Sequence, residues 1–246
     1  MERTNQREQI EQVVVTAQQM REIEGRIFEA GMPVAALMEK VAQLIAARIQ
    51  ALYPRSHSTH RVGVLVGPGH NGGDALVVAR ELHLQGYNVL IYRPIETLKS
   101  LTAQHAQYAA SLGIPFYKQI QPLQTCDLII DGLFGFGQTR SLSGEVADAI
   151  NQLNQWSQPI VSIDLPSGIH TDTGAVLGTA IRATRTFCLG LWKLAFLQDQ
   201  ALEYLGKAEL IDFGIPTMDV WAILGQPAGM MRMTAATVRH YLPLPR

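Results

Sequence analysis

The chain has 246 residues, of which 47% are hydrophobic and 17% charged, and its formal net charge is −1. This composition excludes a disordered chain, and the near-zero charge gives no basic surface for nucleic acid. With no apolar run of ~18 residues and only two cysteines, we expect a soluble, cytoplasmic protein that is neither membrane-spanning nor held together by disulfides.

Two helices are predicted at the start of the chain. Thr16 and Gln19 have the spacing of a capping box, and apolar residues then repeat at helical intervals up to Gly31. Pro33 suits the first turn of a second helix, which ends before Pro54. We assign residues 1–54 to an N-terminal helical arm of the same domain.

From residue 55 onward, short β-branched runs alternate with helical segments. The predicted strands are Val62–Val66, Asn88–Tyr92, Asp127–Asp131, Ile160–Asp164, Ala183–Leu189 and Lys207–Phe213. The predicted helices between them are Ala75–Gln85, Ser100–Leu112, Glu145–Trp156 and Ala195–Leu205. Such alternation predicts a three-layer α/β/α sandwich with a Rossmann-like, mostly parallel sheet. Residues 55–216 form this core, and residues 217–246 are a C-terminal tail or linker.

The loop after the first strand contains glycines and polar side chains. Gly67, Gly69 and Gly72 satisfy G-x-G-x-x-G, but the acidic residue expected ~20 positions later is absent and Arg93 stands near that place. Asn71 and Asp74 suit ligand hydroxyls or a hard cation, whereas a capped strand-to-helix turn is the alternative. An NADP-dependent dehydrogenase therefore stays open as a less favoured reading.

Two other strands end in an aspartate. Asp131 precedes a second glycine loop in which Arg140 could pair with phosphate, and Asp164 precedes a Pro-Ser-Gly turn. Each could also be a solvated or capping carboxylate at a surface turn. Because parallel strands end at one edge of the sheet, three such loops predict a common site. Lys193 either faces this site or lies on the surface.

Several motifs in this order resemble the NAD(P)H-hydrate epimerase family, the YjeF amino-terminal domain. Gly69–Asp74 resembles its GNNGGD motif, with His70 in place of the first asparagine. The run that begins at Asp131 resembles its D-x-x-x-G-x-G motif. Asp164-Leu-Pro-Ser-Gly, followed by Asp172-Thr-Gly, resembles its D-x-P-S-G…D-T-G motif. In the arm, Glu24 replaces a usual aspartate.

The resemblance implies an isomerase for metabolite repair, which interconverts the R and S forms of NADH or NADPH hydrated at ring carbon 6. Residues implied to contact this substrate are His70, Asn71, Gly72, Gly73, Asp74, Gly135, Phe136, Gly137, Gln138, Thr139, Arg140, Ser141 and Asp164. Asn71, Asp131 and Ser167 would bind a potassium ion. Our hypothesis makes Asp164 the catalytic general acid–base, because epimerisation moves protons at oxygen or nitrogen.

The resemblance also implies partners. A homodimer is expected, together with a functional link to an ADP- or ATP-dependent hydrate dehydratase. Residues 237–246 look like the lead-in to such a domain, which suggests a fragment of a bifunctional protein. The alternative from another class is a non-catalytic dimeric binding or scaffold module of the same fold, which would not need Asn71, Asp131, Asp164 and Ser167.

Overall fold

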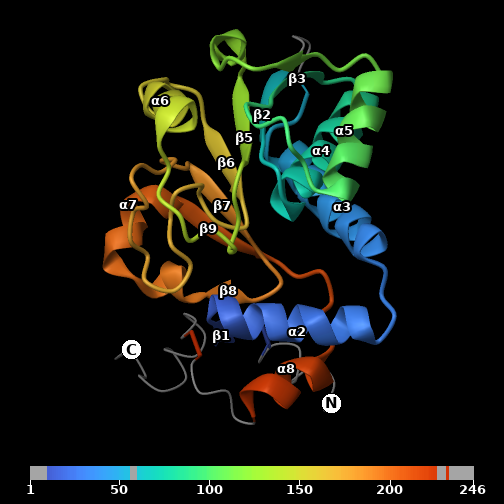
Figure 1. Ribbon diagram of the computed structural model, residues 1–246, viewed down its shortest axis with the longest axis vertical. Coiled ribbons are helices and arrows are strands. Elements are labelled where there is room, and N and C mark those ends of the chain that lie inside the picture. Colours follow the sequence, from blue (N-terminus) through green and yellow to red (C-terminus); the bar gives the residue numbers. More distant parts are fainter. Residues whose placement is uncertain (1–9, 56–59, 226–230, 233–246) are drawn as a thin grey trace, which may run out of the picture.

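A seven-stranded, fully parallel sheet forms the centre of the computed structural model, which describes residues 10–55, 60–225 and 231–232. Its strands, in spatial order, are β4 (Phe116–Tyr117), β3 (Asn88–Tyr92), β2 (Arg61–Val66), β5 (Leu128–Gly132), β6 (Ile160–Ile163), β7 (Arg185–Leu189) and β9 (Lys207–Ile211). From β2 the chain builds the sheet outward to β4 and then returns to add β5 on the other side of β2 (Figure 1). The strand order therefore reverses between β2 and β5, where an open parallel sheet has its ligand crevice.

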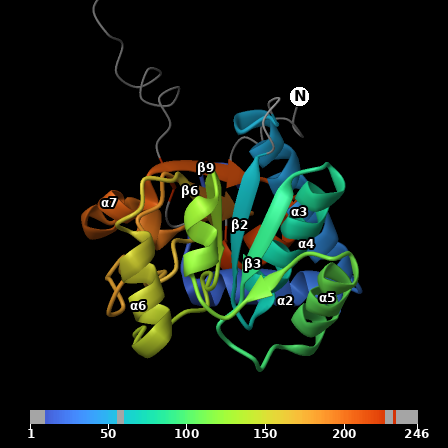
Figure 2. The ribbon, with the colours of Figure 1, turned by 90° about the horizontal axis from the view of Figure 1, so that it is seen from above.

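Helices cover both faces of the sheet (Figure 2). On one face lie α3 (Val34–Leu52), α4 (His70–Leu84) and α5 (Ser100–Ser111), and on the other lies α6 (Gly144–Leu153). The alternation of side chains along each strand divides the core accordingly. Val62 and Val64 of β2 pack in the cluster that contains α3 and α4, whereas Leu65 packs with Ile150 and Leu153 of α6. The structure thus confirms the predicted three-layer sandwich.

A third group of elements closes the end of the sheet where the carboxyl ends of β2, β5 and β6 lie. It contains the helix α2 (Ala17–Glu29) and the short parallel pair β1 (Val14–Val15) and β8 (Trp192–Lys193), with α8 (Thr217–Leu224) packed against α2 (Figure 1). The capping box at Thr16 and Gln19 is present as predicted. No single helix in the described part of the chain is long and apolar enough to cross a membrane, although α2 and α3 meet that test as a pair bent by 119°.

Some predicted elements differ from the structure. The helix expected from Ala75 begins at His70, so the loop predicted around Asn71 is the first turn of α4. Instead of one helix over 195–205, the chain makes two 3₁₀ turns, Leu194–Leu197 and Asp199–Ala201, and the short α7, Leu202–Leu205. A third 3₁₀ turn, Gln121–Thr125, precedes β5. Residues 217–224 of the predicted tail form α8, and the predicted lead-in at 237–246 lies outside the described residues.

Helix α2 is held by residues distant in the sequence. The carboxylate of Asp172 accepts a hydrogen bond from the Ala17 backbone N–H at 2.7 Å, which satisfies a first-turn donor of the helix. Arg26 pairs with Asp219 of α8 at 3.0 Å. The Asp-Thr-Gly motif found in the sequence therefore positions the arm helix.

Replacing Asp172 with alanine should lower the free energy of unfolding by about 1 kcal/mol, because a first-turn N–H of α2 loses its acceptor. Thermal unfolding measures this loss. Asp148→Ala on the exposed face of α6 is the matched control and should leave the melting temperature unchanged. An Asp172→Ala protein as stable as the control would contradict the capping role.

Candidate active site

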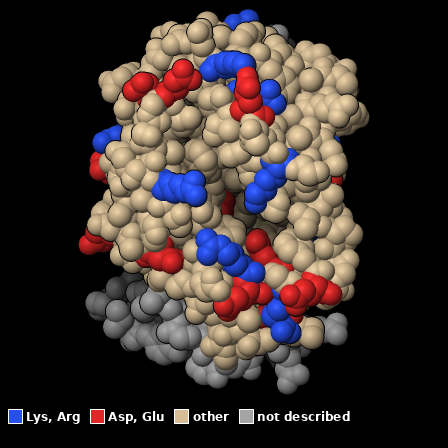
Figure 3. All heavy atoms as spheres, viewed as in Figure 1, with Lys and Arg blue, Asp and Glu red and all other residues tan. Residues whose placement is uncertain are grey.

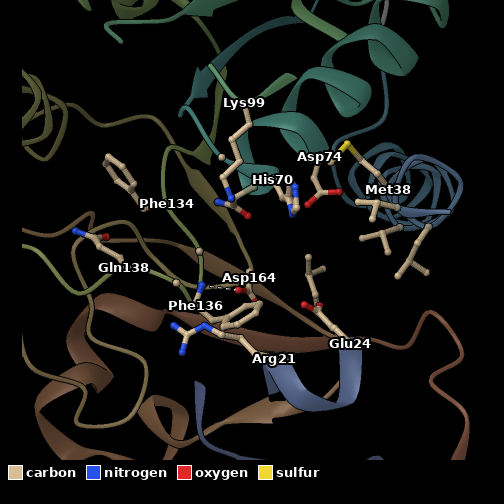
Figure 4. Close-up of a pocket in the computed structure, with 18 of the residues that line it drawn as sticks. Arg21, Glu24, Met38, His70, Asp74, Lys99, Phe134, Phe136, Gln138 and Asp164 are labelled. Carbon is tan, nitrogen blue, oxygen red and sulfur yellow. Dashed lines mark hydrogen bonds between the residues drawn. The ribbon is translucent and has the colours of Figure 1, made fainter. Parts of the chain in front are cut away.

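A cavity of about 520 Å³ lies at the carboxyl ends of the strands, between the loops that follow β2, β5 and β6 and the helix α2. Figure 3 shows that side of the molecule hollowed at its centre, with basic side chains around the hollow. Figure 4 shows the polar groups that face the cavity from its different walls. The strand ends predicted from the sequence thus form one site, and α2 adds a wall to it.

Asp164 has an unusual backbone conformation at the end of β6. Its φ is +68°, and it is the one non-glycine residue with a positive φ in the described part of the chain. The Leu165 N–H donates to the Ile163 carbonyl at 2.9 Å, which makes Asp164 the central residue of a tight γ-turn. Such a turn costs of order 1–3 kcal/mol and is found mainly at functional sites. The strain directs the carboxylate of Asp164 into the cavity (Figure 4).

The Asp164 carboxylate forms a buried ion pair with Lys193. Lys193 Nζ lies 2.6 Å from Asp164 Oδ1 and 2.6 Å from the Leu189 carbonyl oxygen, and its side chain is fully buried. Burial alone would lower the pKa of Lys193, but Asp164, together with the nearby Cys188 and Glu24, more than offsets burial, and the pKa is raised. The other oxygen, Asp164 Oδ2, accepts the Phe136 N–H at 2.8 Å. Lys193 therefore belongs to the site, which decides the alternative left open by the sequence.

The first turn of α4 packs closely against the loop after β5. A Cβ added to Gly67 would lie 1.6 Å from the Leu133 carbonyl oxygen, and one added to Gly72 would lie 2.0 Å from the Gly67 oxygen. Close backbone contacts therefore leave room only for glycine at Gly67 and Gly72, two of the three glycines of the G-x-G-x-x-G pattern. The contact brings the side chains of His70, Asn71 and Asp74 to the cavity.

Asp131 lies beneath the cavity and is completely buried. One carboxylate oxygen accepts hydrogen bonds from the Ser167 hydroxyl, at 2.6 Å, and from the Leu133 backbone N–H. The other accepts hydrogen bonds from the Ser162 hydroxyl and, at 2.9 Å, from the Ser167 backbone N–H. Burial raises the pKa of Asp131 although these four hydrogen bonds oppose the shift. The network ties the end of β5 to the Pro-Ser-Gly turn after β6.

Asn71 and Asp164 approach each other at Gly135. A Cβ at Gly135 would lie 2.9 Å from Asp164 Oδ2 and 3.2 Å from Asn71 Oδ1, so the loop needs a glycine there. The buried Asn71 Nδ2 has no hydrogen-bond partner among the described residues. Asn71, Asp131 and Ser167 together offer oxygen atoms and one buried carboxylate, a donor set suited to a hard cation. A positive charge there would also offset the cost of burying Asp131.

The cavity contains two further carboxyl groups. Burial raises the pKa of Glu24, on α2, to about 7, and it raises the pKa of Asp74, on α4, well above its usual value. Burial and the nearby Lys99 lower the pKa of His70. The site therefore combines the Asp164–Lys193 ion pair with two carboxyl groups that hold their protons to higher pH than usual and an imidazole that favours its neutral form.

The structure brings most of the predicted ligand-binding residues to the cavity. Those that line it are His70, Asn71, Asp74, Gly135, Phe136, Gly137, Gln138 and Asp164. Gly72 and Gly73 are buried in α4, and Asp131 and Ser167 are fully buried and are not among the lining residues. Thr139, Arg140 and Ser141 are exposed on the turn beyond Gln138 and are not among the lining residues. Ligand contact by all these residues stays a prediction.

Sequence reasoning did not assign to the site several side chains that line the cavity, among them Arg21, Glu24, Met38 and Lys99. Arg21 and Glu24 lie on α2, where their spacing is that of any polar helix face. The one sequence signal for Glu24 was that it replaces an aspartate usual in the helical arm of the family that the sequence resembles. Lys99 precedes α5, and its backbone N–H donates to the Pro68 carbonyl at 2.9 Å, which brings it beside the glycine loop.

Comparison with known proteins agrees with this architecture. The chain is 54% identical over 233 residues to the bifunctional NAD(P)H-hydrate repair enzyme Nnr of a Synechocystis strain, which covers 95% of this chain and 44% of that protein. It is 37% identical to the NAD(P)H-hydrate epimerase of a Limosilactobacillus reuteri strain, covering 79% of this chain and 92% of that protein. The chain spans less than half of the bifunctional relative.

A solved structure shares the fold. The crystal structure of yeast YNL200c superposes with a TM-score of 0.77 at 23% identity and covers 90% of this chain and 96% of that one. The sequence also matches the family described as YjeF-related protein N-terminus over residues 34–195, which include Asn71, Asp131, Asp164 and Lys193. The strand-end motifs, the fold and these matches agree, and the chain belongs to the YjeF-related N-terminal domain family.

Proposed function

We propose that this chain is an NAD(P)H-hydrate epimerase, an isomerase that interconverts the R and S forms of NADH and NADPH hydrated at ring carbon 6. The observation that carries the proposal is the Asp164–Lys193 pair in a cavity at the reversal point of the sheet. The epimerase relative that aligns over 92% of its length supports it. Repair of damaged nicotinamide cofactors is the corresponding role.

The repair role also implies a partner activity. The bifunctional relatives carry a repair enzyme name and are more than twice as long as the matched region. We infer that a hydrate dehydratase acts with this chain, either in the same polypeptide or as a separate protein. An epimerase supplies such an enzyme with the isomer that it accepts.

The reaction requires proton transfer at a defined position. The configuration of ring carbon 6 changes only when a bond to that carbon breaks and re-forms from the opposite face. Either the hydroxyl leaves and water returns, or the ring opens at nitrogen and closes again, and both routes move protons at oxygen or nitrogen. Asp164 provides a carboxylate for this transfer, fixed by Lys193 Nζ on one oxygen and by the Phe136 N–H on the other.

Other residues suit a phosphate-bearing nucleotide. Arg21 and Lys99 line the cavity from opposite walls and place positive charge near its mouth (Figure 4). The aromatic ring of Phe136 lies beside Arg21 and Lys193, with cation-to-centroid distances of 5.9 and 5.6 Å. These groups would bind the anionic part of the ligand and orient its ring towards Asp164.

We further propose that Asn71, Asp131 and Ser167 hold a potassium ion. When bound, the ion would supply positive charge that stabilises the buried Asp131 carboxylate and favours an anionic ligand. Support comes from the oxygen-only donor set and from the burial of Asp131.

Asp164→Asn should reduce the epimerisation rate about 10²–10⁴-fold, because a carboxamide cannot accept the proton. Asparagine tolerates a positive φ and its oxygen can still accept from Lys193, but the buried ammonium loses its counter-charge, so circular dichroism must first show that the variant is folded. Chromatographic conversion of R-hydrate to S-hydrate measures the rate above the uncatalysed interconversion. Asp148→Asn on α6 is the control. Full activity of Asp164→Asn would remove Asp164 from the chemistry.

Potassium should raise the melting temperature relative to lithium at equal ionic strength. At ten times the dissociation constant, binding stabilises the folded state by about 1.4 kcal/mol, or roughly 3–6 °C for a domain of this size. The Ser167→Ala protein should show no difference between the two salts. Identical melting temperatures of the unaltered protein in both salts would contradict the cation site.

We also propose that the chain forms a homodimer in the cytoplasm. Its two cysteines, Cys126 and Cys188, are both unpaired, as a reducing compartment requires. Exposed apolar side chains at Met32, between α2 and α3, and at Met218, on the helix α8 that packs against α2, are 39% and 70% accessible and support a contact there. Light scattering at micromolar concentration should give twice the mass of the chain, and a monomer mass would contradict the dimer.

A further inference from the structure

We propose that Glu24 is a second catalytic residue of the site, which donates a proton to the substrate while Asp164 accepts one. This role rests on the proposed epimerase activity. Glu24 belongs to the arm helix α2, and it lies before the stretch 34–195 over which the family match runs.

Geometry places Glu24 at the reacting end of the cavity. Figure 4 shows its side chain rising from α2 on the same side of the cavity as Asp164, whereas Asp74 and His70 lie across from them on α4. Among the described residues, none donates a hydrogen bond to the Glu24 carboxyl group. In contrast, both oxygens of Asp164 have protein partners. The Glu24 carboxyl group is therefore available to a ligand.

The charges around Glu24 divide the two carboxyl groups into an acid and a base. Burial raises the pKa of Glu24 to about 7, Lys193 and Arg21 oppose this shift, and Asp164 adds to it. Asp74, on the facing helix, is also raised by burial, with Asp164 and Glu24 contributing. Asp164 has the direct contact with Lys193, so it serves as the base, and Glu24, with a pKa raised to about 7, still has a protonated form at neutral pH that can donate. Two carboxyl groups with different protonation states are the usual basis of acid–base pairs.

A balanced cycle follows for ring opening and closure. The Asp164 carboxylate removes the proton from the hydroxyl on carbon 6, and the O–H electron pair forms the C=O bond. The bond between carbon 6 and the ring nitrogen breaks, its electron pair stays on nitrogen, and Glu24 protonates that nitrogen. The aldehyde then rotates and presents its other face. Closure runs each transfer in reverse, so both side chains regain their starting states and no oxidant or other reactant is needed.

The test compares Glu24→Gln with the unaltered protein in the assay of R-to-S conversion between pH 5 and pH 9. Glu24→Gln should lower kcat about 10²–10⁴-fold with little change in KM, because the carboxamide keeps the shape but not the transferable proton. The unaltered enzyme should lose activity above pH 7 as Glu24 ionises, and the residual activity of Glu24→Gln should not show that limb. Glu24→Asp should retain part of the rate. Glu22→Gln, on the exposed side of the same helix, is the matched control.

Stability provides a readout besides activity. Because the pKa of Glu24 is higher in the folded than in the unfolded chain, ionisation of the unfolded state removes stability as pH rises from about 4.5 to about 7. Glu24→Gln removes this loss, so its melting temperature should exceed that of the unaltered protein at pH 8 and approach it at pH 5. A Glu24→Gln protein that is destabilised at pH 8 would contradict the neutral carboxyl group.

The outcomes separate this inference from the proposed function. If the unaltered protein converts the hydrate and Glu24→Gln retains its kcat and its pH profile, Glu24 is not a proton donor and the epimerase proposal stands. If the unaltered protein does not exceed the uncatalysed rate, the epimerase proposal and the role of Glu24 are both overturned. A loss confined to KM would make Glu24 a binding residue only and would overturn its catalytic role.

Discussion

The ion pair between Asp164 and Lys193 is the interaction on which the organisation of the site depends. A fully buried ammonium group is tolerated in a protein interior only when its charge and its donors are matched, and breaking such a pair costs about 3–5 kcal/mol. Here the match comes from the Asp164 carboxylate and the Leu189 carbonyl. Three separate segments must therefore meet: the end of β6, the end of β7 and the strand β8. The strained γ-turn at Asp164 persists because this pairing compensates for it.

The second constraint is the way in which the glycine loops meet. Contacts at Gly67, Gly72 and Gly135 leave no room for a Cβ, so the loops after β2 and β5 form one rigid surface. Two hydrogen bonds from Ser167 to the Asp131 carboxylate extend this surface to the turn after β6, and a third, from Ser162, joins it to β6 itself. Against this rigid half of the site lies α2, which is attached through side chains and a two-residue strand pair. A preformed surface and a separately anchored helix together enclose the ligand space.

Much of this arrangement could be predicted from the sequence, because parallel strands have continuous apolar patterns and glycines at their ends. Six of the seven strands of the sheet and the meeting of Asn71, Asp131 and Asp164 follow from local signals, whereas the short β4 and the order of the strands do not. Other features depend on tertiary contacts. A loop was predicted at His70–Asp74 since glycine has a low helix propensity, yet these residues begin α4 because Gly72 must pack against Gly67. The family resemblance of the arm is the one sequence signal for Glu24, and its approach to the cavity that Asp164 lines arises only when α2 crosses the end of the sheet.

The anchoring of α2 has a consequence for how the protein is made. Its contacts join residues separated by 155 positions at Asp172 and by 193 positions at Asp219. On a ribosome, α2 therefore emerges before both partners, because Asp172 and Asp219 follow it in the chain. The sheet from β2 to β6 can assemble from local crossover units, whereas the wall that carries Arg21 and Glu24 must wait for α8. The Arg26–Asp219 contact that holds α2 therefore forms only after residue 219 has been synthesised, whereas strands β2 to β6 lie entirely before that point.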